Sequence, residues 1–173
     1  LVDFANHAMK AGATVAEAED AVSGLGFDDV RVQEVGDDLR VRTAAIEGTD
    51  AERVALATNA ERLKRFHAAR ANEATLWSRA IYPLLMLAER DDILAWAQAP
   101  VVTRWPVGDF ELRGVADGAL ARDEAGLPAE PYLLVIEAKR GVDAQDPMAQ
   151  CVGSMLAVAL GRLSGATPVE VFG

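Results

Sequence analysis

The sequence predicts an α/β protein of the α+β kind, with a mixed central sheet flanked by helices in the order helix, three strands, helix, strand. Three observations predict this architecture. Apolar residues follow helical spacing from residue 73, strand-like runs follow residue 100, and an uninterrupted apolar run at residues 132–136 precedes an apolar helical segment at residues 148–160. The 173 residues suffice for one domain with a small attachment.

The first 70 residues predict an acidic extension that consists of a helix, a β-hairpin and a second helix. Capping boxes at Thr14-Val-Ala-Glu17 and Thr49-Asp-Ala-Glu52 begin the two helices, and the second helix runs towards Arg70. Between them, apolar and polar residues alternate over residues 29–43 around a turn at Gly36-Asp-Asp38. We therefore divide the chain into an extension, residues 1–70, and a core, residues 71–173.

The core is predicted to begin with a helix that Asn72 caps. Its apolar positions from Leu76 to Leu87 form one broad face, so the helix is expected to pack on something large. Pro83 is expected to bend this helix or to loosen it locally, because proline removes a backbone donor.

The rest of the core is predicted to supply the sheet and a second helix. Residues 101–105 and 110–120 read as antiparallel strands, and residues 122–131, with their glycine and prolines, read as a turn or loop between strands. The apolar run at residues 132–136 predicts a central strand that is covered on both faces. Residues 148–160 then form a buried helix after Asp146-Pro147, and residues 168–172 form a final strand.

The composition indicates a soluble protein of a reducing compartment, which we take to be the cytoplasm. The apolar stretches are shorter than the roughly 18 to 20 residues that cross a bilayer, so no membrane partner is expected. Cys151 is the single cysteine and cannot form an internal disulfide, so we interpret it as a small core residue. The two histidines, His7 and His67, are too few and too distant for a usual zinc site.

The charge distribution bears on possible partners. The net charge of −10 opposes binding of polyanions by bulk electrostatics. Residues 1–60 carry most of this acidity, whereas residues 61–80 contain five basic and two acidic side chains. This basic segment either solvates a helix or forms a phosphate-facing surface.

Three charged residues fall where the sheet should be buried. Glu137 and Lys139 lie two residues apart after the central strand and so project from one face, and Asp117 lies in the preceding strand. Two carboxylates about 5 Å apart repel by roughly 3 kcal/mol at an effective dielectric of 20, so a positive charge must lie between them. Lys139 alone satisfies this need in a buried ion-pair network. The other possibility is a divalent cation bound by both carboxylates and the backbone carbonyl of Ala138.

These residues and their order resemble the PD-(D/E)xK nuclease superfamily over residues 72–173, and most closely the N-terminal nuclease domain of type I restriction endonuclease motor subunits. The resemblance implies a restriction-endonuclease-like core. Three stretches carry it: Asn72-Glu-Ala-Thr75 leading to Ile81-Tyr-Pro-Leu-Leu85; Val115-Ala-Asp-Gly118; and Leu134-Val-Ile-Glu-Ala-Lys-Arg140 followed by Gln150.

The resemblance implies a Mg²⁺-dependent nuclease that hydrolyses phosphodiester bonds, with DNA as the favoured substrate, a role in restriction or defence against foreign DNA, and Mn²⁺ as a substitute metal. Asp117 and Glu137 would bind the metal with the Ala138 carbonyl, and Lys139 would assist the attacking water. Glu73 would join the metal shell, although a carboxylate favoured by the helix dipole explains it nearly as well.

Further residues are implied in nucleic-acid binding. Gln150 would contact metal-bound water or nucleic acid, and Arg140 and Arg70 would contact phosphates. Arg79 ranks below Arg70, because six helical positions turn it away from Glu73.

The sequence departs from the family pattern at two positions. Ala116 precedes Asp117 where many members have proline, and Ser154 stands where one variant has tyrosine. The alternative function is therefore a catalytically inactive nuclease-like domain that binds nucleic acid or a protein. The chain has no GxxxxGK[ST] loop, so it encodes no ATPase motor, and specificity would come from a protein partner or a further domain.

Overall fold

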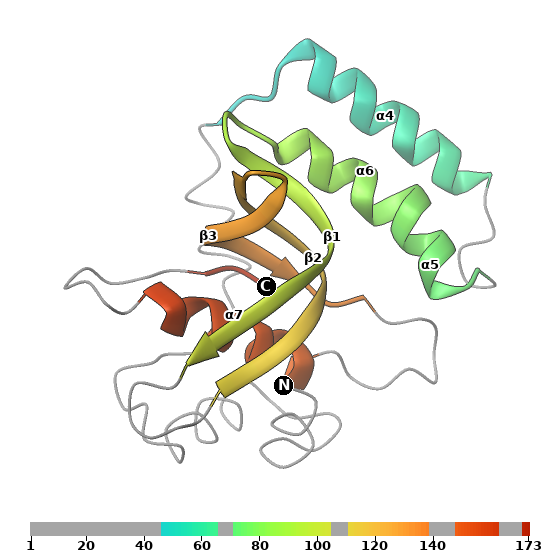
Figure 1. Ribbon diagram of the computed structural model, residues 1–173. Coiled ribbons are helices and arrows are strands. Elements are labelled where there is room, and N and C mark those ends of the chain that lie inside the picture. The colour runs from blue at the N-terminus through green and yellow to red at the C-terminus, as the bar shows by residue number, and fades with distance from the viewer. Residues whose placement is uncertain (1–45, 66–70, 105–110, 139–147, 163–170) are drawn as a thin grey trace.

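The computed structural model describes residues 46–65, 71–104, 111–138, 148–162 and 171–173 (Figure 1). These residues form an α+β arrangement of a three-stranded antiparallel sheet and helices, as predicted. The expected helix and hairpin within residues 1–45 lie outside the described residues, as do residues 168–170 of the expected last strand. The helical and strand elements are α4 (Asp50–Lys64), α5 (Glu73–Leu76), the π-helical η2 (Trp77–Ile81), α6 (Tyr82–Leu85), the 3₁₀ turn η3 (Met86–Ala88), β1 (Ile93–Arg104), β2 (Glu111–Glu124), β3 (Leu127–Ile136) and α7 (Met148–Arg162).

The sheet has the order β1-β2-β3, so β2 lies in the middle of the described strands. The outer edge of β3 is also paired, because Phe172 forms a parallel bridge with Leu134. The amide of Val135 donates to the Phe172 carbonyl at 2.9 Å, and the Phe172 amide donates to the Leu133 carbonyl at 3.1 Å. Around Leu134, β3 therefore has hydrogen-bonded neighbours on both sides.

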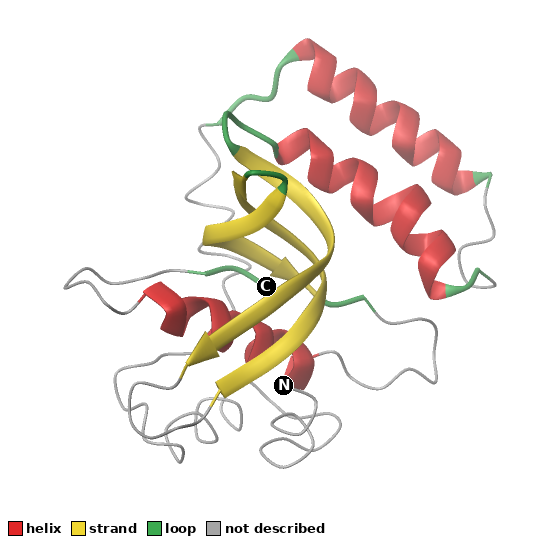
Figure 2. Ribbon diagram, viewed as in Figure 1, coloured by secondary structure: helices red, strands yellow, loops and turns green. Residues whose placement is uncertain are grey.

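Helices cover both faces of the sheet (Figure 2). On one face, Ala157 and Val158 of α7 pack with Val135, which is fully buried. On the other face, Leu85 of α6 packs with Leu120 and is joined by Trp77 and by the β3 residues Leu134 and Ile136. The predicted coverage of residues 132–136 on both faces is thus observed, except that Leu133 is 38% exposed.

The helix from Glu73 to Ala88 begins and loosens where the sequence predicts. The Asn72 side chain accepts a hydrogen bond from the Thr75 amide at 2.8 Å. The helix widens to a π-helix at Trp77–Ile81, directly before Pro83. Proline at position 83 has no amide to continue the α-helical ladder, which accounts for the local change.

The α4 helix packs beside α6 and η2, outside the sheet layer (Figure 1). Its capping box is formed as predicted between Thr49 and Glu52. The Nδ2 of the buried Asn59 donates to the Ala80 carbonyl at 3.3 Å, and Arg90 pairs with Glu52. These polar contacts attach α4 to the helix that covers the sheet.

Two strand boundaries differ from the prediction. The first strand, β1, begins at Ile93 rather than at residue 101 and continues through Pro100. Proline lacks the backbone amide that donates a hydrogen bond to a neighbouring strand, so it is tolerated in strands at the edge of a sheet. β1 lies at the edge of the described sheet, which explains why it can contain Pro100.

The predicted turn or loop at residues 122–131 is too long, because β2 continues to Glu124 and β3 begins at Leu127, so that only Ala125 and Gly126 lie between the two strands of this hairpin. Ala125 (φ 55°) and Gly126 (φ 83°) both have positive φ, as a two-residue turn of the I′ type requires, and the Gly126 amide donates to Asp123 Oδ1 at 2.9 Å. Further along, the register passes from Leu134 opposite Leu120 to Tyr132 opposite Ala121. This bulge at Leu133 explains the exposure of that side chain.

Candidate active site

Asp117 lies in the middle strand β2, between the fully buried Ala116 and the buried Gly118. Its Oδ2 accepts a hydrogen bond of 2.8 Å from the backbone amide of Ala138. This contact joins β2 to the segment that follows β3. Two parts of the chain that the sequence predicted to converge are therefore adjacent.

Glu137 follows the last residue of β3 and lies on the α7 side of the sheet. The pairing of β2 with β3 ends at Gly118 and Ile136, and Asp117 and Glu137 are the residues directly beyond this pair on the two sides of the ladder. Continuing the same antiparallel register would place them opposite one another. Residues directly opposite in such a ladder have Cβ atoms about 4.5 to 5.5 Å apart. The Glu137 Oε1 accepts a hydrogen bond of 2.9 Å from Ser154 Oγ of α7, and Ser154 is 2% exposed.

Ser154 is the partner that sequence reasoning missed. The sequence marked it only as a departure from the tyrosine of one nuclease variant. The spacing of Ser154 from Gln150 could have identified it, because residues four positions apart share one face of a helix. A hydroxyl one turn beyond a predicted site residue is well placed to bind a carboxylate on the sheet.

On the other face of the sheet, Gly118 lets Trp77 approach the backbone of β2. A Cβ atom built at Gly118 would collide with the Trp77 indole and would also lie 3.2 Å from the Trp96 carbonyl. The glycine beside Asp117 is therefore required by packing, and the indole supports β2 directly behind the site.

Cys151 lies beside the site on α7. Burial raises the pKa of its thiol to about 11, and the negative charge of Glu137 contributes to the same shift. A thiol with so high a pKa stays protonated near neutral pH, so it serves neither as a nucleophile nor as a thiolate ligand there. This agrees with the interpretation of Cys151 as a small core residue.

The oxygen atoms at the candidate site are of the kind that a hard cation binds, but they are few. Asp117, Glu137 and the Ala138 carbonyl all present oxygen, which Mg²⁺ and Mn²⁺ prefer. Within the described residues, no group of three or more His, Cys, Asp or Glu side chains is placed to hold a metal ion. Glu73, half-buried at the first position of α5, is thus not grouped with Asp117 and Glu137.

The remaining predicted site residues have different outcomes. Gln150 lies in the first turn of α7, and its Oε1 is buried without a hydrogen-bond partner among the described residues. Lys139, Arg140 and Arg70 lie outside the described residues, so their predicted roles stay predictions.

Comparisons with known proteins identify no relative of this chain. No protein-family model, no curated protein and no solved structure matches the chain. Among the helices that the structure describes, none combines the length and apolar character needed to cross a membrane.

Proposed function

We propose that the chain is a metal-dependent nuclease domain that hydrolyses phosphodiester bonds, with DNA as the favoured substrate and a restriction-endonuclease-like core. The observation that carries this proposal is the 2.8 Å hydrogen bond between Asp117 and the Ala138 amide. It holds a carboxylate of β2 against the segment that bears Glu137 and Ala138. The order of a helix, three antiparallel strands, a second helix and a parallel bridge at Phe172 supports the same proposal.

In this proposal, Asp117, Glu137 and the Ala138 carbonyl hold a Mg²⁺ ion, with Mn²⁺ as a substitute. When bound, such an ion supplies positive charge for the phosphoryl oxygens and lowers the pKa of a coordinated water. The Ala138 amide and the Ser154 hydroxyl each donate to one carboxylate oxygen and so fix its direction. Lys139 is proposed to orient or deprotonate the attacking water, and Glu73 and Gln150 to complete the surroundings.

Nuclease assays with matched variants test this function. Linear, circular and single-stranded DNA and RNA are incubated with the protein in Mg²⁺, in Mn²⁺ and in EDTA. We expect cleavage in either metal and none in EDTA, and a loss of at least about 100-fold for Asp117→Ala, since removal of one charge-stabilising group commonly costs that much. Glu124→Gln is the control, because Glu124 is an exposed carboxylate on the same strand. If Asp117→Ala cuts as well as the parent, the proposal is wrong.

A second candidate function is a nuclease-like module that binds nucleic acid or protein without cutting. The observation that favours it is the small donor set, since the described residues contain no three-ligand group. Titration calorimetry separates the two functions. The nuclease requires Mn²⁺ binding that Glu137→Gln abolishes, whereas the binding module predicts nucleic-acid or protein binding with no effect of this substitution.

A further inference from the structure

Gln98 lies in the middle of β1 in a backbone conformation that is foreign to strands. Its φ is 52°, in the left-handed region that residues other than glycine seldom adopt. Two further described non-glycine residues have positive φ, Asp91 and Ala125, and both lie in turns. Gln98 instead lies within a strand that is paired on both sides of it. Such a conformation costs free energy, which the surrounding fold must supply.

The left-handed residue changes which side of β1 faces the core. Successive residues of a strand point to opposite faces, so residues three positions apart are expected on opposite sides. Trp96 and Ala99 nevertheless both pack in the core cluster on the α7 side. Ala116 and Ala119 of β2 do the same. Alternation is therefore broken at one level of both strands, which bend along their length (Figure 1).

Gln98 and Asp117 are the two residues at this level. β1 pairs with Gly118 and with Ala116 of β2, one position to either side of Asp117, so the register places Gln98 across from Asp117. Gln98 is exposed and Asp117 is half-buried. Glu137 lies on the opposite side of β2, directly beyond the last pair that β2 forms with β3. The candidate site thus continues onto β1, as a row of Gln98, Asp117 and Glu137.

We propose that Gln98 is a substrate-binding residue of this site, and that its carboxamide donates a hydrogen bond to a phosphate oxygen of nucleic acid bound beside Asp117. Irregular residues of this kind re-aim side chains next to active sites. A carboxamide carries two donors and no charge, so it binds phosphate without forming an ion pair with the carboxylates that are proposed to hold the metal. The inference rests on the proposed function for the class of ligand, and it adds β1 to the strands that form the site.

A purely structural role does not explain the residue type at position 98. The break in alternation needs a left-handed residue, and glycine or asparagine adopts this conformation more readily than glutamine. Within the part of the chain that the structure describes, the Gln98 side chain forms no hydrogen bond that would compensate. A ligand beside Asp117 accounts for the carboxamide, which the fold itself leaves unexplained.

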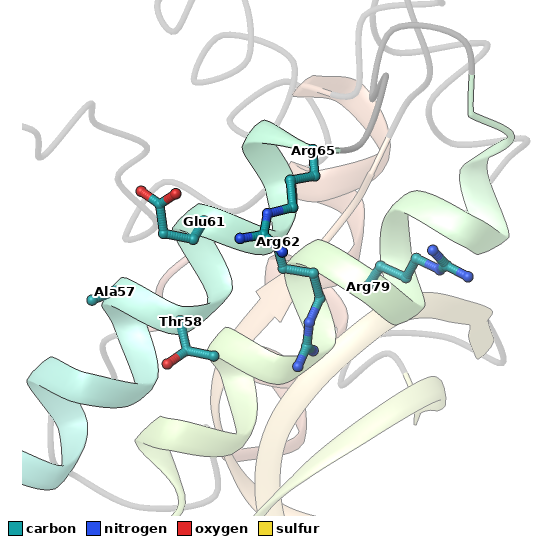
Figure 3. Close-up of a pocket in the computed structure, with 6 residues that line it drawn as sticks. All are labelled: Ala57, Thr58, Glu61, Arg62, Arg65 and Arg79. Carbon is teal, nitrogen blue, oxygen red and sulfur yellow. The ribbon is translucent and has the colours of Figure 1, made fainter.

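The depression between α4 and η2 offers no comparable reason to bind phosphate (Figure 3). Arg62 lies in the last turn of α4 and Arg65 at its C-cap, where the helix dipole stabilises basic residues. Arg79 extends from the neighbouring helix away from both, and it has an interaction of its own. The phosphate contact is therefore assigned to the row at Asp117.

Titration calorimetry with Mn²⁺ tests the position of Gln98 without any substrate. Gln98→Glu would place a third carboxylate beside Asp117 and Glu137, so Mn²⁺ should bind about 10-fold more tightly than to the parent. Val102→Glu is the matched control, because it adds the same charge at an exposed position of the same strand and should leave the affinity unchanged. No gain for Gln98→Glu over this control would place Gln98 outside the site and overturn the inference.

Gln98→Gly tests the role of the carboxamide. Glycine relieves the left-handed strain, so the urea midpoint should stay the same or rise. Loss of one hydrogen bond to a charged oxygen should lower kcat/KM for DNA cleavage about 10-fold, and weaken DNA binding in Ca²⁺ by a similar factor. Val102→Gly should show the reverse pattern, with lower stability from glycine in a strand and unchanged DNA affinity.

The binding measurement separates this inference from the proposed nuclease function. If the parent binds DNA in Ca²⁺ but cuts none in Mg²⁺ or Mn²⁺, the nuclease function fails, and weaker binding by Gln98→Gly still supports the role of Gln98. If the parent cuts DNA and Gln98→Gly equals it in affinity and in kcat/KM, the role of Gln98 fails and the nuclease function stands. A parent that neither binds nor cuts DNA contradicts both.

Discussion

The thiol of Cys151 is predicted to be unreactive in the folded protein. Burial, with a smaller effect from Glu137, raises its pKa to about 11, and the thiolate is the species that alkylates. We expect slow modification by iodoacetamide at pH 8, fast modification in urea, and a rate that rises as the pH approaches 11. Mass spectrometry of timed samples measures all three. Equal rates in the folded and the urea-unfolded protein at pH 8 would contradict the prediction.

The same thiol makes folding stability depend on pH. Its pKa is raised from 9.0 to about 11 on folding, so the folded state holds the proton more tightly. Its contribution is fully present below pH 9 and is lost as the pH rises towards 11, by an amount on the order of 2 to 3 kcal/mol. Urea unfolding of the parent and of Cys151→Ala at pH 8 and pH 10.5 checks this, and the variant should lose less stability between the two.

The capping box of α4 gives a prediction at low pH. The Glu52 amide donates to Thr49 Oγ1 at 3.2 Å, and the Thr49 amide donates to Glu52 Oε2 at 2.6 Å. This amide bond is the largest cause of the lowered Glu52 pKa, and the next is the Thr49 hydroxyl, which donates to the same Glu52 Oε2 at 2.9 Å. Alanine at position 49 removes the hydroxyl bond, whose contribution is present above about pH 4.5 and is lost as the pH falls. Thr49→Ala should cost about 1 kcal/mol at pH 7 in urea unfolding, and less at pH 3.

A threonine within the same helix provides the control for this substitution. Thr58 is exposed, and its hydroxyl donates to the Val54 carbonyl at 2.8 Å, one turn earlier. Alanine has the higher helix propensity, so Thr58→Ala should be neutral or slightly stabilising. A Thr49→Ala protein as stable as the parent at both pH values would exclude a role for the cap.

At the scale of elements, the contact between η2 and β2 depends on Gly118. A Cβ at this position collides with Trp77, so Gly118→Ala forces the helix or the strand to shift. Such overpacking costs about 1 to 3 kcal/mol, measured as a shift in the urea midpoint. Gly48→Ala is the control, because a Cβ there meets nothing closer than 3.6 Å and the position is exposed.

A double variant tests whether Trp77 is the cause. In Gly118→Ala/Trp77→Leu the smaller side chain leaves room for the new methyl group. The double variant should therefore be more stable than the sum of the two single losses predicts, by about 0.5 to 3 kcal/mol. Strict additivity would show that the Trp96 carbonyl, and not Trp77, limits the space.

The elements that could be predicted are those with a local cause. Side-chain caps at Thr49 and Asn72 predict where helices begin, and Pro83 predicts the irregular turn before it. The short length of the turn at Ala125-Gly126, and the extent of β2 and β3 on its two sides, could not be predicted in this way. The flanking prolines favour a loop locally, but pairing of β3 with β2 over a bulge outweighs that preference.

At the scale of the whole molecule, sequence spacing predicted part of the candidate site. The approach of Asp117 to the segment at Ala138 follows from two antiparallel strands joined by a short connection, and the structure contains it. The contact of Ser154 with Glu137 depends on how α7 lies across the sheet, which no local pattern states.

Metal binding at the candidate site should stabilise the entire fold. Asp117 belongs to β2 and Glu137 follows β3, and Ser154 of α7 donates to Glu137, so an ion held there would connect three elements. A ligand that binds only the folded state at about 100 times its Kd adds about 2.7 kcal/mol. For a domain of this size, that corresponds to a rise in unfolding temperature of roughly 5 to 10 °C.

Differential scanning fluorimetry with Mn²⁺ measures this rise without any substrate. We expect it for the parent and for Glu124→Gln, whose exposed carboxylate lies outside the site. Glu137→Gln and Asp117→Asn should show none, because each removes a charged oxygen ligand while keeping the shape of the side chain. An equal rise in all four proteins would place the bound metal elsewhere, and no rise in the parent would mean that the two carboxylates serve only to join β2, β3 and α7.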